Sequence, residues 1–278
     1  MTTVSVVIPA YNNAEYLEET LTSVFAQTFE DFEVIVSDHS STDSTKAVIE
    51  KFRHEPRLVI LDTEAGGGAL RNWNRVSQAA TGTYLKLVCG DDLIHPDILA
   101  KQVAAMQSAS NVVLVASPRS IVDARSQPVI ARRGLAGLRG QMAGVRAARA
   151  TVRSGTNIFG EPACVLIRRD VLERVGWWDS RFPYLIDEAT YVRVLLEGNF
   201  VAVPEVLAGF RISDSQWSVR LAGQQAQQAS DFHRWLKLDH PNVVNRGDVL
   251  LGNARAYAMS FARRLAYILL RRRMNRAI

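Results

Sequence analysis

One mainly apolar run that ends in two acids constrains this chain more than any other feature. The run extends from Tyr84 to Cys89 and is followed at once by Gly90, Asp91 and Asp92. It predicts a buried strand, and two adjacent carboxylates at its end repel each other unless a partner neutralises them. Hard carboxylate oxygens suit Mg²⁺ or Mn²⁺, which makes a divalent cation the usual partner. A solvated Gly-Asp-Asp turn is the alternative, because these residue types also favour turns.

Strands and helices are predicted to alternate through the first 116 residues. The runs that predict strands are 4–9, 32–38, 58–61, 83–89 and 112–116, and the segments between them have apolar residues at helical spacing. This alternation indicates a parallel sheet with helices on both faces. Polar residues follow four of these strands, at 11–12, 38–39, 64–68 and 91–92. Because ligands bind at the carboxyl ends of such strands, the sequence predicts one shared crevice, for which a nucleotide is a natural occupant.

The glycine-rich phosphate loops of other nucleotide-binding folds are absent from the sequence. No Gly-x-Gly-x-x-Gly follows the first strand, and no Gly-x-x-x-x-Gly-Lys-Ser/Thr occurs anywhere. The segment Gly66–Gly68 is either a flexible turn before a helix or part of the site, and the pattern does not separate the two. We therefore expect a metal ion and basic side chains such as Arg71 to neutralise phosphate.

Several sequence motifs occur along the chain, before and after the two adjacent acids. They occupy 4–12, 21–29, 32–45, 69–72, 80–84, 90–92, 160–162, 165–179 and 187–198. Together they resemble a family 2 glycosyltransferase of the GT-A fold, over roughly residues 4–212. The resemblance implies an α/β fold with a Rossmann-like, mostly parallel sheet flanked by helices. It also implies transfer of a sugar from a nucleotide-diphosphate sugar, with inversion at the anomeric carbon.

The resemblance also implies a role for individual residues. Those implied to bind the nucleotide sugar are Pro9, Ala10, Tyr11, Asn12, Asp38, His39, Gly67, Arg71, Asn72 and Asp91. Asp92, with Asp91 beside it, matches the ligands of Mn²⁺ or Mg²⁺, and such an ion would neutralise the leaving diphosphate. Asp187 matches the general base that takes the proton of the acceptor hydroxyl, with Glu188 as the adjacent alternative. Glu161 and Trp178 are expected to contact the acceptor.

Three positions depart from the family pattern. His39 stands where a second acid normally accepts a hydrogen bond from the base, so uridine, guanosine and thymidine donors all remain open. Ser213 stands where members often have a histidine that would be a further metal ligand. Gly90 stands where a third acid or a small polar residue often lies. With these changes we still expect catalysis, but the identity of the nucleotide-sugar donor is less well defined.

We expect three segments along the chain. Residues 1–215 are predicted to form the glycosyltransferase domain, with a nucleotide-binding half at 1–117 and an acceptor-binding half at 118–215. Residues 216–278 are predicted to form a helical extension with a basic tail. The arginine-rich segment 132–156 between the halves is either a mobile loop over the site or a solvated basic helix.

The net charge of +5 is unevenly distributed. Residues 249–278 contain seven arginines and no acid, so the rest of the chain carries −2, and no nucleic-acid partner is indicated. The apolar stripe of the last helix, with its arginines, suits an anionic membrane surface; a helix packed on the domain with solvated arginines is the alternative. The sequence has no basic leader and no run that could span a bilayer, and its two cysteines fit a reduced compartment. We therefore expect a cytoplasmic protein, which is peripheral at the inner face of the membrane if the last helix binds lipid.

The sequence thus predicts a metal-dependent inverting enzyme that adds one sugar to a glycan or lipid-linked acceptor. It lacks the Gln-x-x-Arg-Trp motif and the membrane helices of the processive branch of the family. Two alternatives stay open: a nucleotide-sugar-binding protein without turnover, and a nucleotidyltransferase, although the chain lacks the glycine-rich basic loop expected of the latter.

Overall fold

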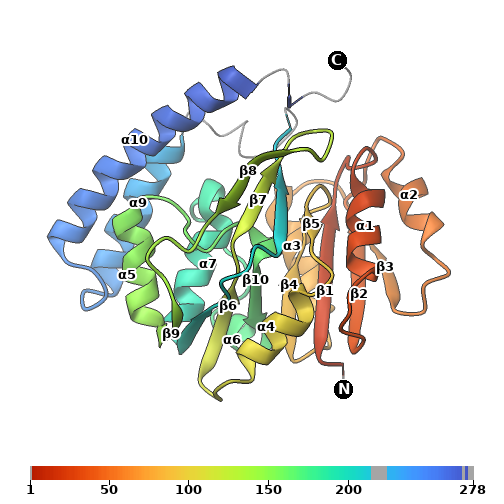
Figure 1. The fold of residues 1–278 in the computed structure, drawn as a ribbon, viewed down its shortest axis with the longest axis horizontal. Helices are drawn as coiled ribbons and strands as arrows, with labels where there is room; N and C mark the ends of the chain where they lie inside the picture. Colours follow the sequence, from red (N-terminus) through yellow and green to blue (C-terminus); the bar gives the residue numbers. More distant parts are fainter. Residues whose placement is uncertain (1, 214–223, 271–272, 275–278) are drawn as a thin grey trace.

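The computed structural model describes residues 2–213, 224–270 and 273–274. A central eight-stranded sheet has the order β3-β2-β1-β4-β10-β6-β11-β9, with helices on both of its faces (Figure 1). The strands of this sheet are β1 Val4–Ala10, β2 Phe32–Asp38, β3 Leu58–Asp62, β4 Tyr84–Leu87, β6 Val112–Ala116, β9 Gly140–Ala143, β10 Val165–Arg168 and β11 Asn199–Ala202.

The predicted parallel sheet is present in the first half of the chain. Strands β3, β2, β1 and β4 run parallel, and β1 pairs with β2 from Val4↔Phe32 to Ala10↔Asp38. All seven residues of β1 are buried, as expected for a strand covered on both faces. The intervening helices are α1 Leu17–Phe25, α2 Thr45–Lys51, α3 Gly68–Gln78 and α4 Ile98–Met106. The α/β fold class is therefore confirmed.

Strand β10 joins the two halves of the chain into one sheet. It lies between β4 and β6 and runs antiparallel to both, although it follows them by about fifty residues or more in sequence. Short strands form a second, four-stranded sheet in the order β5-β12-β7-β8. These strands are β5 Leu93–Ile94, β7 Arg119–Val122, β8 Pro128–Arg133 and β12 Ala208–Arg211.

The segment 132–156 is a basic helix only in its second part, where Arg146, Arg149 and Arg153 are exposed. It contains the end of β8, the edge strand β9 and helix α5 Gly144–Ser154. One face of α5 is buried, and a Cβ at Gly144 would lie 2.0 Å from the carbonyl oxygen of Leu195, so only glycine allows this contact. The remaining elements of this half are η1 Pro162–Cys164, α6 Arg169–Arg174, η2 Pro183–Leu185 and α7 Ile186–Leu195.

Of the two C-terminal helices, α9 Gln225–Asp239 and α10 Arg246–Leu270, α10 packs on both α5 and α9, and α9 also contacts η2 (Figure 1). The contact with α5 is close, because a Cβ at Gly252 would lie 2.2 Å from the carbonyl oxygen of Val152. The last helix therefore packs on the domain, while a stripe of its apolar side chains stays exposed. Among the described residues, no helix combines the length and the apolar character needed to cross a bilayer.

Candidate functional site

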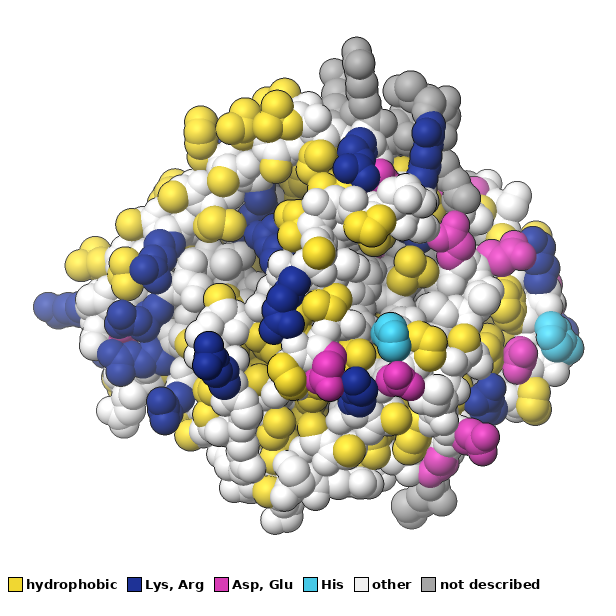
Figure 2. Space-filling view, in the orientation of Figure 1, with side chains coloured by type: hydrophobic (Ala, Val, Ile, Leu, Met, Phe, Trp, Pro, Cys, Tyr) yellow, Lys and Arg dark blue, Asp and Glu magenta, His cyan; other side chains and the backbone are white. Residues whose placement is uncertain are grey.

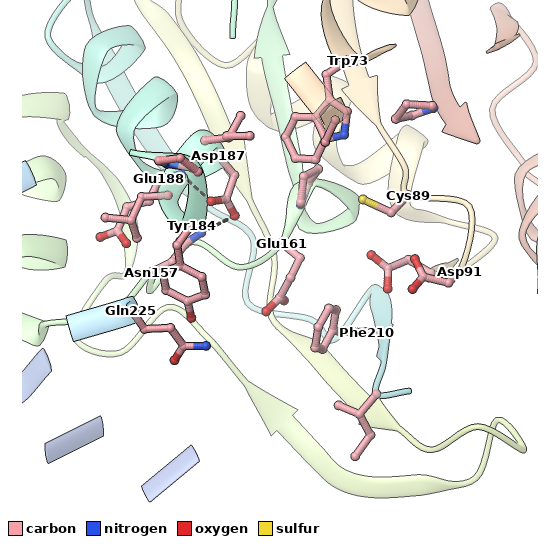
Figure 3. Close-up of a pocket in the computed structure, with 18 of the residues that line it drawn as sticks. Trp73, Cys89, Asp91, Asn157, Glu161, Tyr184, Asp187, Glu188, Phe210 and Gln225 are labelled. Carbon is pink, nitrogen blue, oxygen red and sulfur yellow. Dashed lines mark hydrogen bonds between the residues drawn. The ribbon is translucent and has the colours of Figure 1, made fainter. Parts of the chain in front are cut away.

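The polar residues at the ends of the strands line one cavity of about 800 Å³ (Figure 3). Its walls come from five regions: the carboxyl ends of β1, β2 and β4, the start of α3, the second sheet through β7, β8 and β12, parts of the segment 155–188, and the inner faces of α9 and α10. The shared crevice that the strand ends predicted is therefore present. The contribution of α9 and α10 was not predicted from the sequence.

One end of the cavity is built from the ends of β1 and β2. Tyr11 is 52% exposed there, and its ring lies 5.9 Å from that of His39. The Nε2 atom of His39 lies 2.9 Å from the carbonyl oxygen of Gly66, and this contact fixes the imidazole against the glycine turn. Asn12 adopts a left-handed backbone conformation, with φ of 50°, and its side-chain oxygen accepts a hydrogen bond from the backbone of Thr42. An aromatic face and an imidazole thus lie together at this end.

Asn72 on α3 connects the ends of the two central strands. Its Nδ2 donates to the carbonyl oxygens of Ala10 and Ser37, each at 3.2 Å, and its Oδ1 accepts from Thr63 at 2.8 Å. The side chain is 2% exposed, so these bonds satisfy polar groups that burial would otherwise leave unpaired. Asn72 therefore holds the cavity floor together as well as lining it.

The glycine segment before α3 is a turn that also lines the cavity. Gly66, Gly67 and Gly68 have φ values of 89°, 74° and 62°, which glycine adopts readily. Gly66 and Gly68 line the cavity, whereas Gly67 packs against the stem of Arg71. The guanidinium of Arg71 pairs with Glu64 at 2.6 Å and donates to the carbonyl oxygen of Ala65.

The acids after β4 form a cluster suited to a hard cation. Carboxylate oxygens of Asp91 and Asp92 lie within 4.8 Å of each other and of the Cys89 sulfur. Asp92 is 1% exposed, and burial, followed by the charges of Asp91 and Glu161, raises the pKa of its carboxyl well above the usual range. A bound cation would relieve this cost, and carboxylates are the ligands that Mg²⁺ and Mn²⁺ prefer, whereas a thiol is soft. The residues present therefore fit the expected divalent ion.

Arg211 in β12 positions these acids. It is fully buried, its backbone N–H donates to Oδ1 of Asp92 at 3.2 Å, and its Nε donates to the carbonyl oxygen of Asp91 at 2.9 Å. A Cβ at Gly90 would lie 2.7 Å from Oδ1 of Asn13, so a larger residue there would displace the Asn13 side chain. That side chain accepts a hydrogen bond from the backbone N–H of Tyr11 at 2.8 Å.

Asp187 faces the cavity from the first turn of α7. Its Oδ2 accepts from Nδ2 of Asn157 at 2.8 Å, and its Oδ1 accepts from the backbone N–H of Glu188 (Figure 3). Burial, with a smaller contribution from Glu161, raises the pKa of Asp187 to about 7 in spite of these bonds. A carboxyl with that pKa is suited to take a proton near neutral pH.

Glu188 points away from the centre of the cavity (Figure 3). It is 2% exposed, and its Oε1 accepts from Thr151 at 2.7 Å. Burial raises the pKa of Glu188 to about 7 as well, with a further contribution from Asp187. The geometry therefore favours Asp187 over Glu188 as the group that contacts a substrate.

Glu161 lies between the two groups of acids. It pairs with Arg119 through two contacts of 2.5 and 2.7 Å, and Arg119 is only 4% exposed. The charge of Glu161 acts on both Asp92 and Asp187, and this carboxylate lies between the candidate metal ligands and the candidate base (Figure 3). Its position at the centre of the cavity is consistent with the predicted acceptor contact.

The cavity brings together most of the residues that the sequence singled out. Those that line it are Pro9, Tyr11, Asn12, His39, Asn72, Asp91, Asp92, Glu161, Asp187 and Glu188. Ala10, Asp38, Gly67, Arg71 and Trp178 are described but lie outside the lining. Ala10 and Asp38 support the strand ends through backbone and side-chain bonds instead.

Trp178 corrects the expected acceptor contact. It is 2% exposed, its Nε1 donates to Ser77 at 2.8 Å, and its ring packs edge-on against Trp73 at 5.0 Å. Trp178 is therefore a core residue, and Trp73 presents the aromatic surface to the cavity. Ser213, which stands where the family often has a histidine, is 1% exposed, and residues 214–223 lie outside the described part of the chain.

The cavity residues that were not predicted as site residues include Trp73, Arg133, Tyr184 and Arg263. Arg133 and Arg263 were visible in the sequence only as members of basic segments. Arg263 on α10 donates to Oε1 of Gln225 at 2.8 Å and to the hydroxyl of Tyr184, which closes this end of the cavity. No local pattern shows that an arginine of a basic tail turns inward, because the inward position depends on tertiary packing.

The fold and the site together define the class of protein. Residues 1–349 of Staphylococcus aureus TarS, solved in complex with UDP-GlcNAc, match with a TM-score of 0.71 at 18% identity, over 94% of this chain and 73% of that one. The mannosyltransferase PcManGT of Pyrobaculum calidifontis, solved with GDP-Man and Mn²⁺, matches with a TM-score of 0.66 at 18% identity, over 96% and 75% of the two chains. This is the GT-A fold of glycosyltransferases.

The chain belongs to glycosyl transferase family 2, whose model it matches over residues 5–176. An uncharacterised protein of Mycobacterium tuberculosis is 28% identical over 266 residues, which cover 89% of this chain and 80% of that protein. The putative teichuronic acid biosynthesis glycosyltransferase TuaG of Bacillus subtilis is 32% identical over 108 residues, which cover 38% and 43%. The family assignment confirms the resemblance seen in the motifs and identifies a glycosyltransferase.

Proposed function

We propose that this glycosyltransferase moves one sugar from a nucleotide-diphosphate sugar to an acceptor hydroxyl, with a divalent cation at Asp91 and Asp92 and with Asp187 as the base. The observation that carries the proposal is the placement of these acids in one cavity on two unconnected elements, with Glu161 between them. Solved relatives of the fold that hold UDP-GlcNAc, or GDP-Man with Mn²⁺, support a nucleotide-sugar donor and a metal site.

The proposed reaction needs a base on the face opposite the leaving group. The acceptor oxygen bonds to the anomeric carbon while the bond from that carbon to the diphosphate oxygen breaks, and the nucleotide diphosphate leaves with the electron pair. The acceptor proton passes to Asp187, which Asn157 and the α7 backbone hold in place. When bound, Mn²⁺ or Mg²⁺ supplies charge neutralisation of the departing diphosphate. Attack opposite the diphosphate inverts the anomeric configuration.

The donor end of the cavity is assigned to Tyr11, His39 and the glycine turn. Tyr11 offers an exposed ring for stacking on the base, and the fixed His39 imidazole offers a hydrogen-bonding atom beside it. The acceptor end is assigned to Trp73, Glu161 and Tyr184. An aromatic face of the Trp73 type suits the apolar face of a sugar ring, so a glycan or a lipid-linked sugar is the acceptor class proposed.

A screen of nucleotide sugars for release of nucleoside diphosphate tests the proposal. With Mn²⁺ or Mg²⁺ present, we expect slow hydrolysis of one donor class and faster release once an acceptor is added. Release that is equal with and without EDTA would contradict the metal requirement. Donor binding by calorimetry without release for any donor or acceptor would instead support a binding protein, and formation of a nucleotide sugar from a sugar phosphate would support a nucleotidyltransferase.

The exposed face of α10 is proposed to rest on an anionic membrane surface, at the cytoplasmic side. Its exposed large apolar residues are Leu250, Tyr257, Phe261, Leu265, Ile268 and Leu269. Figure 2 shows hydrophobic side chains gathered along this helix and basic side chains gathered at the same side of the molecule. Apolar residues with adjacent cations are the features that bind helices to anionic lipid. Attachment there would bring the cavity, whose wall α10 forms, close to a lipid-linked acceptor.

A further inference from the structure

Two arginines stand directly opposite each other at the cavity wall. In the antiparallel pair of β7 and β8, Arg119 is the cross-strand partner of Arg133, and both residues line the cavity. Like charges in this relationship repel, since opposed side chains of neighbouring strands lie about 5 Å apart at their Cβ atoms. The fold therefore holds two guanidinium groups side by side where ordinary strand pairing would avoid them.

Only one of the two has a counter-charge. Arg119 is paired with Glu161 through both oxygens of the carboxylate. Arg133 is half-buried, and its side chain makes no hydrogen bond or ion pair with any residue in the described part of the chain. Burial and the nearby charges of Arg119 and Arg263 lower the pKa of Arg133, while Glu161 opposes that change. A half-buried guanidinium without a partner is costly, because its desolvation is not compensated.

The third arginine of this wall, Arg263, has no acidic partner among the described residues. It donates to Gln225, to the Tyr184 hydroxyl and, at 3.4 Å, to Thr156, which are all neutral acceptors. The described acids that face this part of the cavity are Glu161, which is already paired with Arg119, and Asp187 and Glu188. Burial raises the pKa of each of the last two to about 7, so these two carry less than full negative charge near neutral pH. Positive charge therefore predominates around Arg133.

The backbone holds Arg133 at this wall. The next residue, Gly134, has a φ of 113°, and a Cβ there would lie 3.1 Å from Nη1 of Arg119. Leu135 follows with a φ of 54°, is 6% exposed and donates its N–H to the carbonyl oxygen of Ile158 at 2.6 Å. A turn fixed in this way holds the backbone at the end of β8, and with it the Cα of Arg133, at the cavity wall.

We propose that the acceptor end of the cavity binds an anionic substituent, a phosphate or a carboxylate, on the guanidinium of Arg133 with Arg263 beside it. The planar guanidinium binds either oxyanion through two parallel hydrogen bonds. The inference rests on the proposed function, since it names the substrate class of the same cavity. The anionic substituent belongs either to the acceptor, beside the hydroxyl that reacts, or to the sugar of the donor.

Direct binding to the unreacted protein is the first test. Inorganic phosphate is titrated by calorimetry in metal-free buffer of constant ionic strength. We expect Arg133→Gln to weaken phosphate binding about tenfold, the size typical of one charge-assisted contact, and Arg133→Lys to weaken it less. Arg139→Gln is the matched control, because Arg139 is exposed and lies outside the cavity lining. Equal phosphate affinity in Arg133→Gln and the wild-type protein would overturn the proposal.

Transfer assays then distinguish the two sources of the anion. If the acceptor carries it, a sugar 6-phosphate or a hexuronic acid acceptor is preferred over the neutral sugar, and Arg133→Gln raises the KM for the anionic acceptor about tenfold while the KM for the neutral acceptor changes less. If the donor carries it, a nucleotide hexuronic acid is preferred over a nucleotide hexose, and that preference is lost in Arg133→Gln. An equal loss for neutral and anionic substrates, or weaker binding of plain nucleoside diphosphate, would contradict the proposal. Absence of turnover in the wild-type protein would count against the proposed function alone, because phosphate binding is measured separately.

Discussion

Asn157 donates a hydrogen bond of 2.8 Å from its Nδ2 to Oδ2 of Asp187, and so connects the segment before η1 to the first turn of α7. The Oδ1 atom of Asn157 accepts from the backbone N–H groups of Phe159 and Gly160, which fixes the amide in one orientation. The candidate base is therefore held from a segment that also carries Glu161. This arrangement makes the carboxylate rigid before any substrate binds.

Replacement of Asp187 by asparagine should abolish transfer while donor binding persists. The amide keeps the size of the side chain but cannot accept the acceptor proton, so turnover should fall by about 10²- to 10⁴-fold. Nucleotide-sugar affinity measured by calorimetry should change little. Asp62→Asn is the control, since Asp62 is exposed at the end of β3 and lies outside the cavity lining. Full activity in Asp187→Asn would show that another group is the base.

The pH dependence of turnover should report the same carboxyl. Protonated Asp187 cannot take a proton, so kcat should rise with pH and level off above about 7, the pKa to which burial raises this group. The bond from Asn157 lowers that pKa, so Asn157→Ala should move the rising limb to higher pH. Thr22→Ala, on the exposed side of α1, is the control. A limb that shifts to lower pH in Asn157→Ala would contradict this assignment.

Replacement of Asp92 by asparagine should remove the metal dependence of donor binding. An amide is a poorer ligand for Mn²⁺ and Mg²⁺ than a carboxylate. Calorimetric titration of donor with and without Mn²⁺ should show a large difference for the wild-type protein and for Asp62→Asn, and almost none for Asp92→Asn. Retained Mn²⁺ dependence in that variant would place the metal elsewhere.

Buried Lys86 predicts a pH dependence of stability that is unrelated to catalysis. Its Nζ donates to Gln102 and to the carbonyl oxygen of Val165, and burial lowers its pKa to about 7. The unfolded chain has a lysine pKa near 10.4, so it binds more protons between those values and the folded state gains stability as pH rises. Below about 7 this gain is absent.

The Lys86→Met variant should therefore not show this gain in stability as pH rises. We expect the difference in Tm between wild type and variant to shift in favour of the wild type from pH 7 to pH 10, by differential scanning calorimetry. Other groups that titrate in the same range contribute to both proteins, so their contribution cancels in the difference in Tm. Lys46→Met, an exposed lysine in α2, is the control. A constant difference across this pH range would show that Lys86 stays charged in the fold.

The outer face of α10 should bind anionic vesicles. Phe261→Ser combined with Ile268→Ser removes two side chains that are 73% and 71% exposed, so co-sedimentation with phosphatidylglycerol vesicles should fall while the fold is kept. Val59→Ser, at the opposite edge of the sheet, is the control. Unchanged sedimentation, or none with the wild-type protein, would rule out this surface.

The parts of the fold that were predictable are those with local signals. Strands β1 to β4 carry continuous apolar runs, and polar residues mark their carboxyl ends, so both the sheet and its crevice follow from the pattern. Strands β5, β9 and β12 span only two to four residues and have no such run. Their positions depend on pairing between distant segments, which periodicity does not record.

Several site residues were hidden for a related reason. Arg211 belongs to a stretch that seemed notable only for a missing histidine, yet its side chain is fully buried against Asp91 and Asp92, the candidate metal ligands. Charged residues are rarely buried without partners, and the partners of Arg211 lie in other elements, at Glu19, Ser126 and Asp91. Trp178 shows the opposite error, since a residue matched to the acceptor site packs in the core.

The position of β10 also sets the order in which the protein is assembled during synthesis. Strands β4 and β6 leave the ribosome well before β10, which must insert between them. Until residues 165–168 emerge, both strands present unpaired edges that are open to other chains. Chaperone binding should therefore be strongest on nascent chains that end before β10, and truncations in that region should aggregate.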